Sequence, residues 1–209
     1  MFVPASNRVA EDGEIRRMVA AIGAAQLITT GGDGYPRATL LPVIWSGDVV
    51  LAHMARANAH WKEIADGSPA LLVCSGAQAY ISPGWYASKA DDGKVVPTWN
   101  YSSVQLRGSV RVHHDPEWLR AQVTTLTDRH EHERAEPWHV TDAPPAFVEG
   151  QLRGIVGIEL DVEQVDAKAK LSQNRSAQDQ DGVIDGLAHE TGAEAMAVAE
   201  AMRALRPTA

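Results

Sequence analysis

The feature that most constrains the fold is a series of segments in which apolar and polar residues alternate, separated by turn residues. Val104 to Val112 alternates in this way, and so does Ile155 to Val162. A period of two is typical of a strand with one buried face. Residues 31–34 (GGDG) and 46–48 (SGD) can close hairpins, because glycine accepts a positive φ. Strands joined by hairpins predict a mostly β fold, a largely antiparallel barrel with peripheral helices, and not a doubly wound sheet.

The strands can be placed from these alternations and from short apolar runs. Pro42 cannot donate to a strand ladder, so an edge or bulge is expected there, and a bulge or corner is expected at Gly108. We predict strands at residues 25–30, 37–45, 49–54, 70–75, 79–86, 98–113 and 155–162.

Helices are predicted where a capping residue precedes apolar residues at helical spacing. Asp12 and Asp115 begin two of them, Asn58 caps a short one that ends near Gly67, and another follows Pro144-Pro145. A capping box, Thr191 to Glu194, opens a C-terminal helix at about 191–206. Residues 168–186 show no apolar periodicity and predict a long loop. With no dividing linker, residues 1–209 are expected to form one domain.

Charge and composition exclude several classes of function. The chain has 19 basic and 27 acidic residues, a formal net charge of -8, and shows no cluster of basic residues. Direct contact with DNA, a dense polyanion, is therefore doubtful. There is no signal-peptide pattern and no apolar run that could span a bilayer, which predicts a cytoplasmic protein. The single cysteine, Cys74, rules out an intrachain disulfide and is expected to act as a small buried hydrophobe.

Residues 53–62 (HMARANAHWK) are the first candidate binding segment, because they end a strand and open a helix. Free N–H groups at a helix start, together with Arg56, Asn58 and Lys62, suit a phosphate. A capped helix with solvated Arg and Lys accounts for the same residues.

Two further stretches resist explanation by packing alone. Residues 80–86 and 96–101 concentrate aromatic side chains beside polar ones, which suits a planar ligand, a dimer interface or a core corner. Residues 168–175 (KAKLSQNR) are basic in an acidic chain, and they predict either a solvated loop or a contact with an anion. Residues 130–134 (HEHER) lack the second His of a zinc helix, so no metal site is predicted.

Five segments occur together in an order that resembles the PaiB family, described as FMN-binding negative transcriptional regulators. They are residues 37–42 (RATLLP), 53–58 (HMARAN), 80–83 (YISP), 96–101 (VPTWNY) and 170–175 (KLSQNR). The resemblance implies a split β-barrel similar to pyridoxamine-phosphate oxidases, with FMN held between the subunits of a homodimer. Leu40-Leu41-Pro42 departs from relatives that carry a His there, which implies fewer polar contacts to the flavin.

Carried over by position, the resemblance implies four groups of cofactor-binding residues. Residues 39–42 would follow the ring edge, 53–58 would hold the phosphate and ribityl chain, 99–100 would come from the facing subunit, and 170–175 would close the site. The expected cofactor-binding residues are Arg37, Thr39, Leu40, Leu41, Pro42, His53, Met54, Ala55, Arg56, Asn58, Trp61, Lys62, Trp99, Asn100, Lys170, Gln173 and Arg175. Lys170 or Arg175 could stabilise an anionic reduced ring.

Three functions stay open at this point. The chain could be a flavin-binding transcriptional regulator, a small flavin-dependent oxidoreductase that uses NAD(P)H, or a redox-sensing partner protein that binds no DNA. No catalytic residue is evident from the sequence, and analogy of fold cannot choose among these functions.

Overall fold

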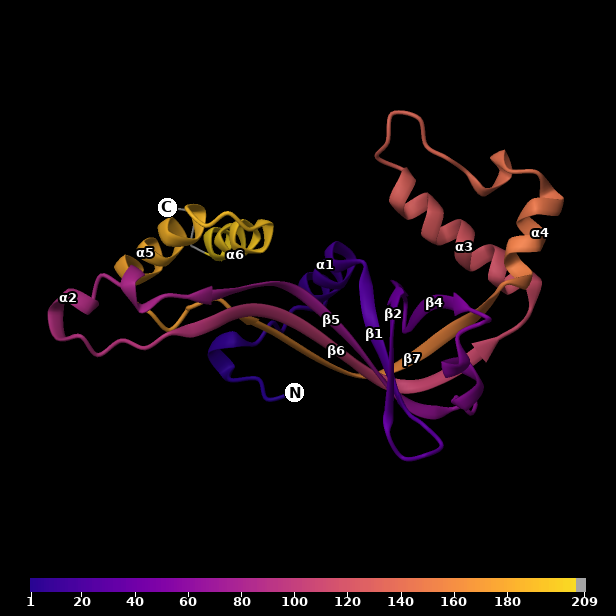
Figure 1. Ribbon diagram of the computed structural model, residues 1–209, viewed down its shortest axis with the longest axis horizontal. Helices are drawn as coiled ribbons and strands as arrows, with labels where there is room; N and C mark the ends of the chain where they lie inside the picture. Colours follow the sequence, from indigo (N-terminus) through magenta and orange to yellow (C-terminus); the bar gives the residue numbers. More distant parts are fainter. Residues whose placement is uncertain (206–209) are drawn as a thin grey trace. The chain divides into compact units, whose positions relative to one another are not determined.

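The computed structural model describes residues 1–205, and their seven strands form one sheet in the order β2-β1-β5-β6-β7-β4-β3 (Figure 1). The strands are β1 (Ala24–Thr30), β2 (Pro36–Pro42), β3 (Ile44–Ser46), β4 (Val49–Ala55), β5 (Ser68–Ile81), β6 (Thr98–His113) and β7 (Ile155–Lys170). The α-helices are α1 (Asp12–Ile22), α2 (Lys89–Asp92), α3 (Pro116–Glu131), α4 (Pro145–Arg153), α5 (Ala177–Ala188) and α6 (Ala193–Ala204). Short 3-10 helices are η1 (Ala5–Asn7), η2 (Ala59–Glu63), η3 (Pro83–Trp85) and η4 (Val140–Asp142).

The contacts divide the chain into two compact units. The first contains Met1–Met18, Ser75–Val104 and the C-terminal part from Asp166, and the second contains Val19–Cys74 and Gln105–Val165. The long strands β5, β6 and β7 each contribute residues to both units. The expectation of one domain over residues 1–209 stays a prediction.

In the second unit, β1 pairs with β2 in an antiparallel hairpin, as the GGDG turn predicts. Leu27 lies opposite Thr39, and Ala25 lies opposite Leu41. Because partners across an antiparallel pair point to the same face, these residues share the buried side of the hairpin. Leu40 points to the other face and is 62% exposed. β2 is the last strand at its side of the sheet, as Pro42 indicated.

The strand predicted for residues 37–45 is in fact two strands, which is a correction. β2 ends at Pro42 and β3 begins at Ile44. Pro42 has no N–H to donate, and the N–H of Val43 donates to the carbonyl of Gly23 at 2.9 Å, which continues the register of β1 with β2 by one residue. After Val43 the backbone changes partners, and β3 pairs with β4.

Helices α3 and α4 pack together in the second unit (Figure 1). Asp115 caps α3 by accepting from the N–H of Trp118 at 2.8 Å, and Pro116 occupies its first turn, as predicted. Leu119, Val148 and Leu152 form a buried apolar cluster between the two helices. Glycine is required at position 157 of β7, because a Cβ there would lie 2.1 Å from the ring of Trp118.

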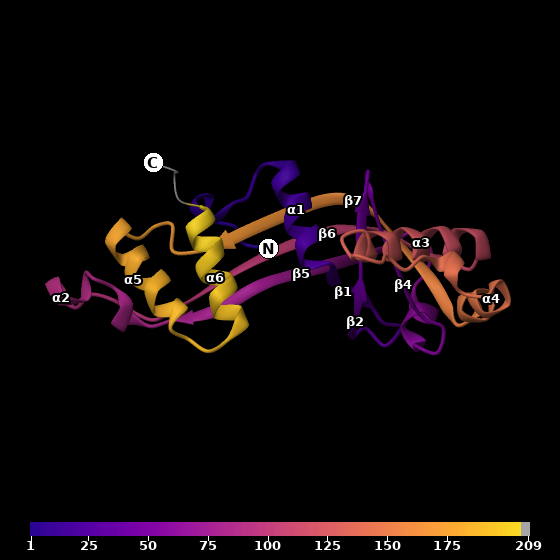
Figure 2. The ribbon, with the colours of Figure 1, turned by 90° about the horizontal axis from the view of Figure 1, so that it is seen from above.

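In the first unit, the long loop predicted for residues 168–186 is wrong. β7 continues to Lys170, and α5 begins at Ala177 (Figure 2). Lys168 looked solvated by its charge, but it is buried, and its Nζ donates to the hydroxyl of Tyr101 at 2.7 Å. Ser176 caps α5, whose buried face is formed by Val183, Ile184 and Leu187.

Two smaller corrections also concern this part of the chain. The strands predicted at residues 70–75 and 79–86 are one strand, β5, and the remainder folds as η3. Helix α6 begins at Ala193, but Thr191 forms no capping box, since Gly192 is the N-cap and no side chain caps it. Glu194 instead accepts from the N–H of Gln78 at 2.8 Å. Within residues 1–205, no helix is both long enough and apolar enough to cross a bilayer.

Candidate functional site

Predicted site residues from β2 and from the segment after β4 form one polar network in the second unit. Asn58 Nδ2 donates to Thr39 Oγ1 at 3.2 Å, and Thr39 Oγ1 lies 2.7 Å from His60 Nδ1. His60 Nε2 lies 2.8 Å from Thr29 Oγ1, which comes from β1. Asn58 Oδ1 also accepts from the N–H of His60 at 3.0 Å, and this bond caps η2. Two residues far apart in sequence, Thr39 and Asn58, are therefore held together.

His60 and Thr29 are the two residues of this network that the sequence analysis did not predict as site residues, and His60 is the central one. Its side chain is buried, at 5% exposure, and both ring nitrogens have hydroxyl partners. Burial is the main reason that the pKa of His60 lies below its usual value; Glu63 nearby raises the pKa and Arg37 lowers it. A neutral ring has one donor and one acceptor nitrogen. The signal available in sequence was only a histidine two residues after a capping Asn.

The proton arrangement leaves Thr39 able to face a ligand. Thr39 Oγ1 accepts from Asn58, so its own proton goes either to His60 Nδ1 or to another acceptor. In the tautomer with a proton on Nδ1, His60 donates to Thr39 and the Thr39 hydroxyl can donate elsewhere. Thr39 is partly exposed, so an acceptor atom can reach it.

The cations of this segment do not all have the same role. Arg56 is tied to backbone, because its Nε donates to the carbonyl of Arg153 at 2.9 Å and its Nη2 to that of Ile155 at 3.0 Å. Arg37 pairs with Asp33 and Glu63, and these carboxylates raise its pKa, Asp33 the more strongly. Lys62 is exposed, and its ammonium lies 5.7 Å from the centre of the Trp61 ring.

Trp61 connects Lys62 to the end of β4. The indole Nε1 donates to the carbonyl of Arg56 at 2.9 Å, and the ring meets His114 edge-on with centroids 5.2 Å apart. The predicted helix start is only the five-residue η2, shorter than the helix to Gly67 that the sequence predicted. Side chains, more than a helix dipole, therefore supply the polarity here.

The other predicted residues of the second unit point in different directions. His53 Nδ1 lies 2.8 Å from Gln122 Oε1 of α3, whereas Met54 is 3% exposed and belongs to the core. Ala55 is exposed, Leu41 is buried, and Pro42 is exposed at the end of β2. Their contact with a cofactor stays a prediction.

The remaining predicted residues belong to the first unit. Asn100 is fully buried, and its amide exchanges hydrogen bonds with Ser172 Oγ at 3.0 and 3.2 Å. Trp99 is 47% exposed, and its ring lies edge-on to Tyr80 at 6.4 Å. This aromatic pair joins residues 80–86 to residues 96–101, the two aromatic segments noted in the sequence.

Residues 170–175 form a tight turn held by their own side chains. Lys170 Nζ donates to Thr98 Oγ1 and to the carbonyl of Trp99, and burial lowers the pKa of Lys170. Gln173 Oε1 accepts from the N–H of Leu171, and its Nε2 donates to the carbonyl of Ala169. The guanidinium of Arg175 lies 4.6 Å from the centre of the Tyr86 ring. That these groups reach a cofactor stays a prediction.

Comparison with known proteins gives a family. Residues 1–164 match the family described as "Putative FMN-binding domain". The chain is 32% identical over 206 residues to "Protease synthase and sporulation protein PAI 2" of Bacillus subtilis, covering 97% of this chain and 96% of that protein. That alignment extends beyond residue 164 and so includes most of the C-terminal part.

Two solved structures share the fold at low sequence identity. The FAD and heme binding protein from Mycobacterium smegmatis aligns with a TM-score of 0.61 at 17% identity, covering 83% of this chain and 78% of that chain. A conserved hypothetical protein from Mycobacterium tuberculosis aligns with a TM-score of 0.60 at 14% identity, covering 83% and 92%. The seven-stranded sheet with its few helices is the split barrel that the sequence resemblance implied. The chain therefore belongs to the PaiB family of FMN-binding split-barrel proteins, whose cofactor is FMN.

Proposed function

We propose that this chain binds FMN through the Thr39–Asn58–His60 network and the adjoining Lys62, and that it acts as a transcriptional regulator in the form of a flavin-bound homodimer. The observation that carries the proposal is the network itself, which joins β2 to the segment after β4. When bound, FMN supplies reversible two-electron chemistry.

The donor set of the network fits FMN. Thr39 and Asn58 offer a hydroxyl and an amide, which can satisfy ring carbonyls and ribityl hydroxyls. Lys62 is an exposed ammonium beside an aromatic ring, and it suits a phosphate. Arg56 is occupied by backbone carbonyls, so its role is to hold the end of β4 in place.

The exposed face of β2 supports the homodimer. Pro36, Ala38, Leu40 and Pro42 are all exposed on this edge strand, and Leu40 alone is 62% exposed. Apolar side chains gathered on an exposed edge favour cover by another protein surface. A second copy of the chain placed on this face would enclose a flavin that lies along β2.

The regulator assignment rests on membership of the PaiB family. The net charge of -8 disfavours a long contact with DNA phosphates. We therefore propose that the flavin-bound dimer exerts its effect through a protein partner, and that its own contact with DNA is weak.

A flavin titration tests the cofactor site. We expect the fluorescence of FMN to be quenched when it binds the purified protein. Thr39→Val should weaken binding by roughly tenfold, since the valine removes the hydroxyl that His60 Nδ1 and Asn58 Nδ2 contact. Lys62→Gln should weaken binding by a similar factor. Thr30→Val is the matched control, because Thr30 is exposed on β1 and outside the network. A colourless protein that ignores added FMN would refute the proposal.

Two assays on the flavin-loaded protein test what it does. A DNA mobility shift that needs a partner protein at physiological salt would support the regulator. Steady consumption of NADH or NADPH would instead make the chain an oxidoreductase, and the regulator proposal would fail.

A further inference from the structure

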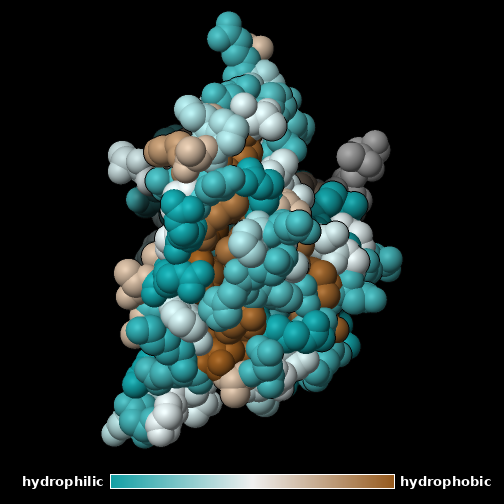
Figure 3. All heavy atoms as spheres, turned by 90° about the vertical axis from the view of Figure 1, so that its right-hand side faces the viewer, coloured by the Kyte–Doolittle hydropathy of each residue, from teal (hydrophilic) through white to brown (hydrophobic). Residues whose placement is uncertain are grey.

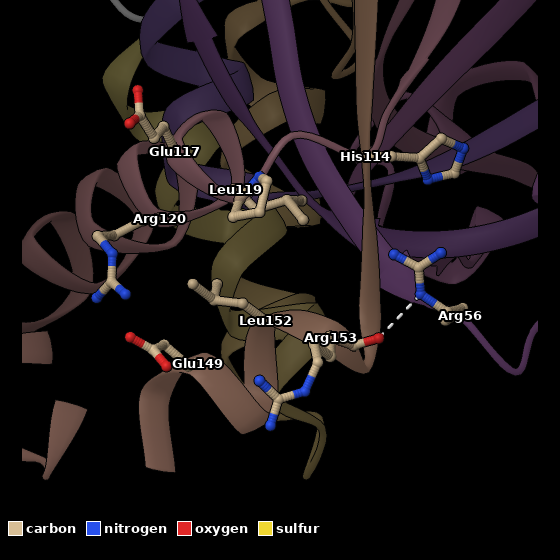
Figure 4. Close-up of a pocket in the computed structure, with 9 residues that line it drawn as sticks. Arg56, His114, Glu117, Leu119, Arg120, Glu149, Leu152 and Arg153 are labelled. Atoms are coloured by element: carbon tan, nitrogen blue, oxygen red, sulfur yellow. Dashed lines mark hydrogen bonds between the residues drawn. The ribbon is translucent and has the colours of Figure 1, made fainter. Parts of the chain in front are cut away.

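A cavity of about 410 Å³ lies in the second unit between α3, α4 and the residue after β4, and none of its lining residues belongs to the Thr39–Asn58–His60 network. Leu119 and Leu152 lie in the middle of its lining, with charged side chains around them (Figure 4). Figure 3 shows the side of the molecule where α3 and α4 lie in Figure 1. Apolar surface is visible there between hydrophilic side chains. A pocket that combines an apolar floor with polar groups around it is typical of a small-molecule site.

The charges around the cavity favour an anion. Arg56, Arg120 and Arg153 line it together with two carboxylates, Glu117 and Glu149. Three guanidinium groups against two carboxylates leave one positive charge, in a chain whose net charge is -8. Within residues 1–205, neither the Arg120 nor the Arg153 side chain is seen to form a hydrogen bond or an ion pair. Their guanidinium groups are therefore available to a ligand.

We propose that this cavity binds a small organic monocarboxylate, with the carboxylate on Arg120 and Arg153 and an apolar body over Leu119 and Leu152. A planar guanidinium can hold a carboxylate through two parallel hydrogen bonds. The two glutamates disfavour a dianion, because the net charge of the lining is a single positive one. A phosphate monoester is therefore a poorer ligand than a carboxylate of the same shape.

One residue that lines this cavity, Arg56, is also bonded to η2, which carries His60 and Lys62 of the proposed FMN site. Arg56 N donates to the carbonyl of Gly154 at 2.8 Å, and the carbonyl of Arg56 accepts from Trp61 Nε1 at 2.9 Å. The same residue thus contacts the end of α4 on one side and η2 on the other. A ligand in the cavity lies against a residue that positions η2.

Calorimetry of the full chain with benzoate tests the proposal. We expect saturable binding of benzoate, weaker binding of phenyl phosphate, and no binding of benzamide, which has the same shape without the charge. Arg120→Gln and Arg153→Gln should each weaken benzoate binding by about tenfold, and Glu149→Gln should strengthen it. Both arginines are exposed and have no structural partner, so these variants should fold.

Arg129→Gln is the matched control, since Arg129 is on α3 but does not line the cavity. The proposal fails if benzoate does not bind at millimolar concentration, if benzamide or phenyl phosphate binds as well as benzoate, or if Arg129→Gln has the same effect as Arg120→Gln. FMN titration of the same variants shows whether a failure of benzoate binding is independent of FMN binding. Arg120→Gln and Arg153→Gln should leave FMN affinity unchanged.

Discussion

His60 and Cys74 are two titratable residues whose burial decides their chemistry. His60 is held neutral between two hydroxyls, and Cys74 is fully buried in β5. Burial disfavours the charged form of either side chain, so it lowers the pKa of His60 and raises that of Cys74 to about 11. Each shift leads to a measurement.

Cys74 is expected to be inert in the folded protein. With a pKa of about 11, roughly one thiol in a thousand is ionised at pH 8, and the thiolate is the reactive form. A colorimetric thiol reagent at pH 8 should therefore react slowly with the native protein and at once in denaturant. Rapid stoichiometric reaction without denaturant would show that β5 exposes this residue.

Stability should fall as the pH decreases below about 6.5, in part because of His60. The unfolded chain binds a proton near the ordinary histidine pKa, whereas the folded chain resists it until lower pH. The contribution is complete above the unfolded pKa and is lost as pH falls toward the folded pKa. Urea unfolding at pH 7.5 and 5.5 measures it.

The matched comparison for this pH effect uses two glutamine variants. His60→Gln should reduce the difference in unfolding free energy between the two pH values, while His130→Gln, an exposed position on α3, should not. Equal pH dependence in wild type and His60→Gln would contradict the assignment.

At the scale of elements, the contact of α3 with β7 depends on the absence of a side chain. A Cβ on Gly157 would lie 2.1 Å from the Trp118 ring, and the ring itself stacks on His113 at 4.2 Å. Trp118 therefore has neighbours on more than one side, and it cannot easily move away. The helix that carries Leu119 and Arg120 is positioned by this contact.

We expect Gly157→Ala to destabilise the protein by about 1–3 kcal/mol, the usual range for overpacking. Gly150→Ala is the opposite case, because a Cβ in α4 would meet only Arg153 at an ordinary 3.7 Å. This second change should stabilise by roughly 0.5–1 kcal/mol through helix propensity. Urea unfolding measures the free energy of unfolding of both variants. An unchanged free energy for Gly157→Ala would mean that α3 can shift without cost.

At the scale of the whole molecule, the proposed homodimer needs a surface that a second copy can cover. β2 is an edge strand, and its outward side chains are apolar. An uncovered edge of this kind is an aggregation hazard in a monomer. Phe147 is similarly exposed, at 59%, but it lies on α4.

If the proposed homodimer forms through β2, Leu40→Glu should convert it to a monomer and lower FMN affinity, because two carboxylates would be buried in the shared surface. Light scattering after gel filtration, at micromolar protein, measures the mass with and without FMN. Phe147→Glu is the control and should remain dimeric. A dimeric Leu40→Glu protein would place the interface elsewhere.

The sequence by itself determined the strands that alternate, the hairpin at residues 31–34, the cap of α3 and the family. These features depend on neighbours along the chain or on motifs in a fixed order, and both can be read without coordinates. Thr39 and Asn58 were also predicted, although their hydrogen bond was not.

Only the tertiary structure decided the features that depend on partners far away in sequence. Lys168 is buried because Tyr101 meets its ammonium, and residues 37–45 divide into two strands because Ile44 to Ser46 pair with β4 and not with β1. His60 entered the site because Thr29 and Thr39 approach it from two strands. The sequence does not reveal such partners of a charged residue or a single histidine, since burial is a property of the packed chain and not of the residue.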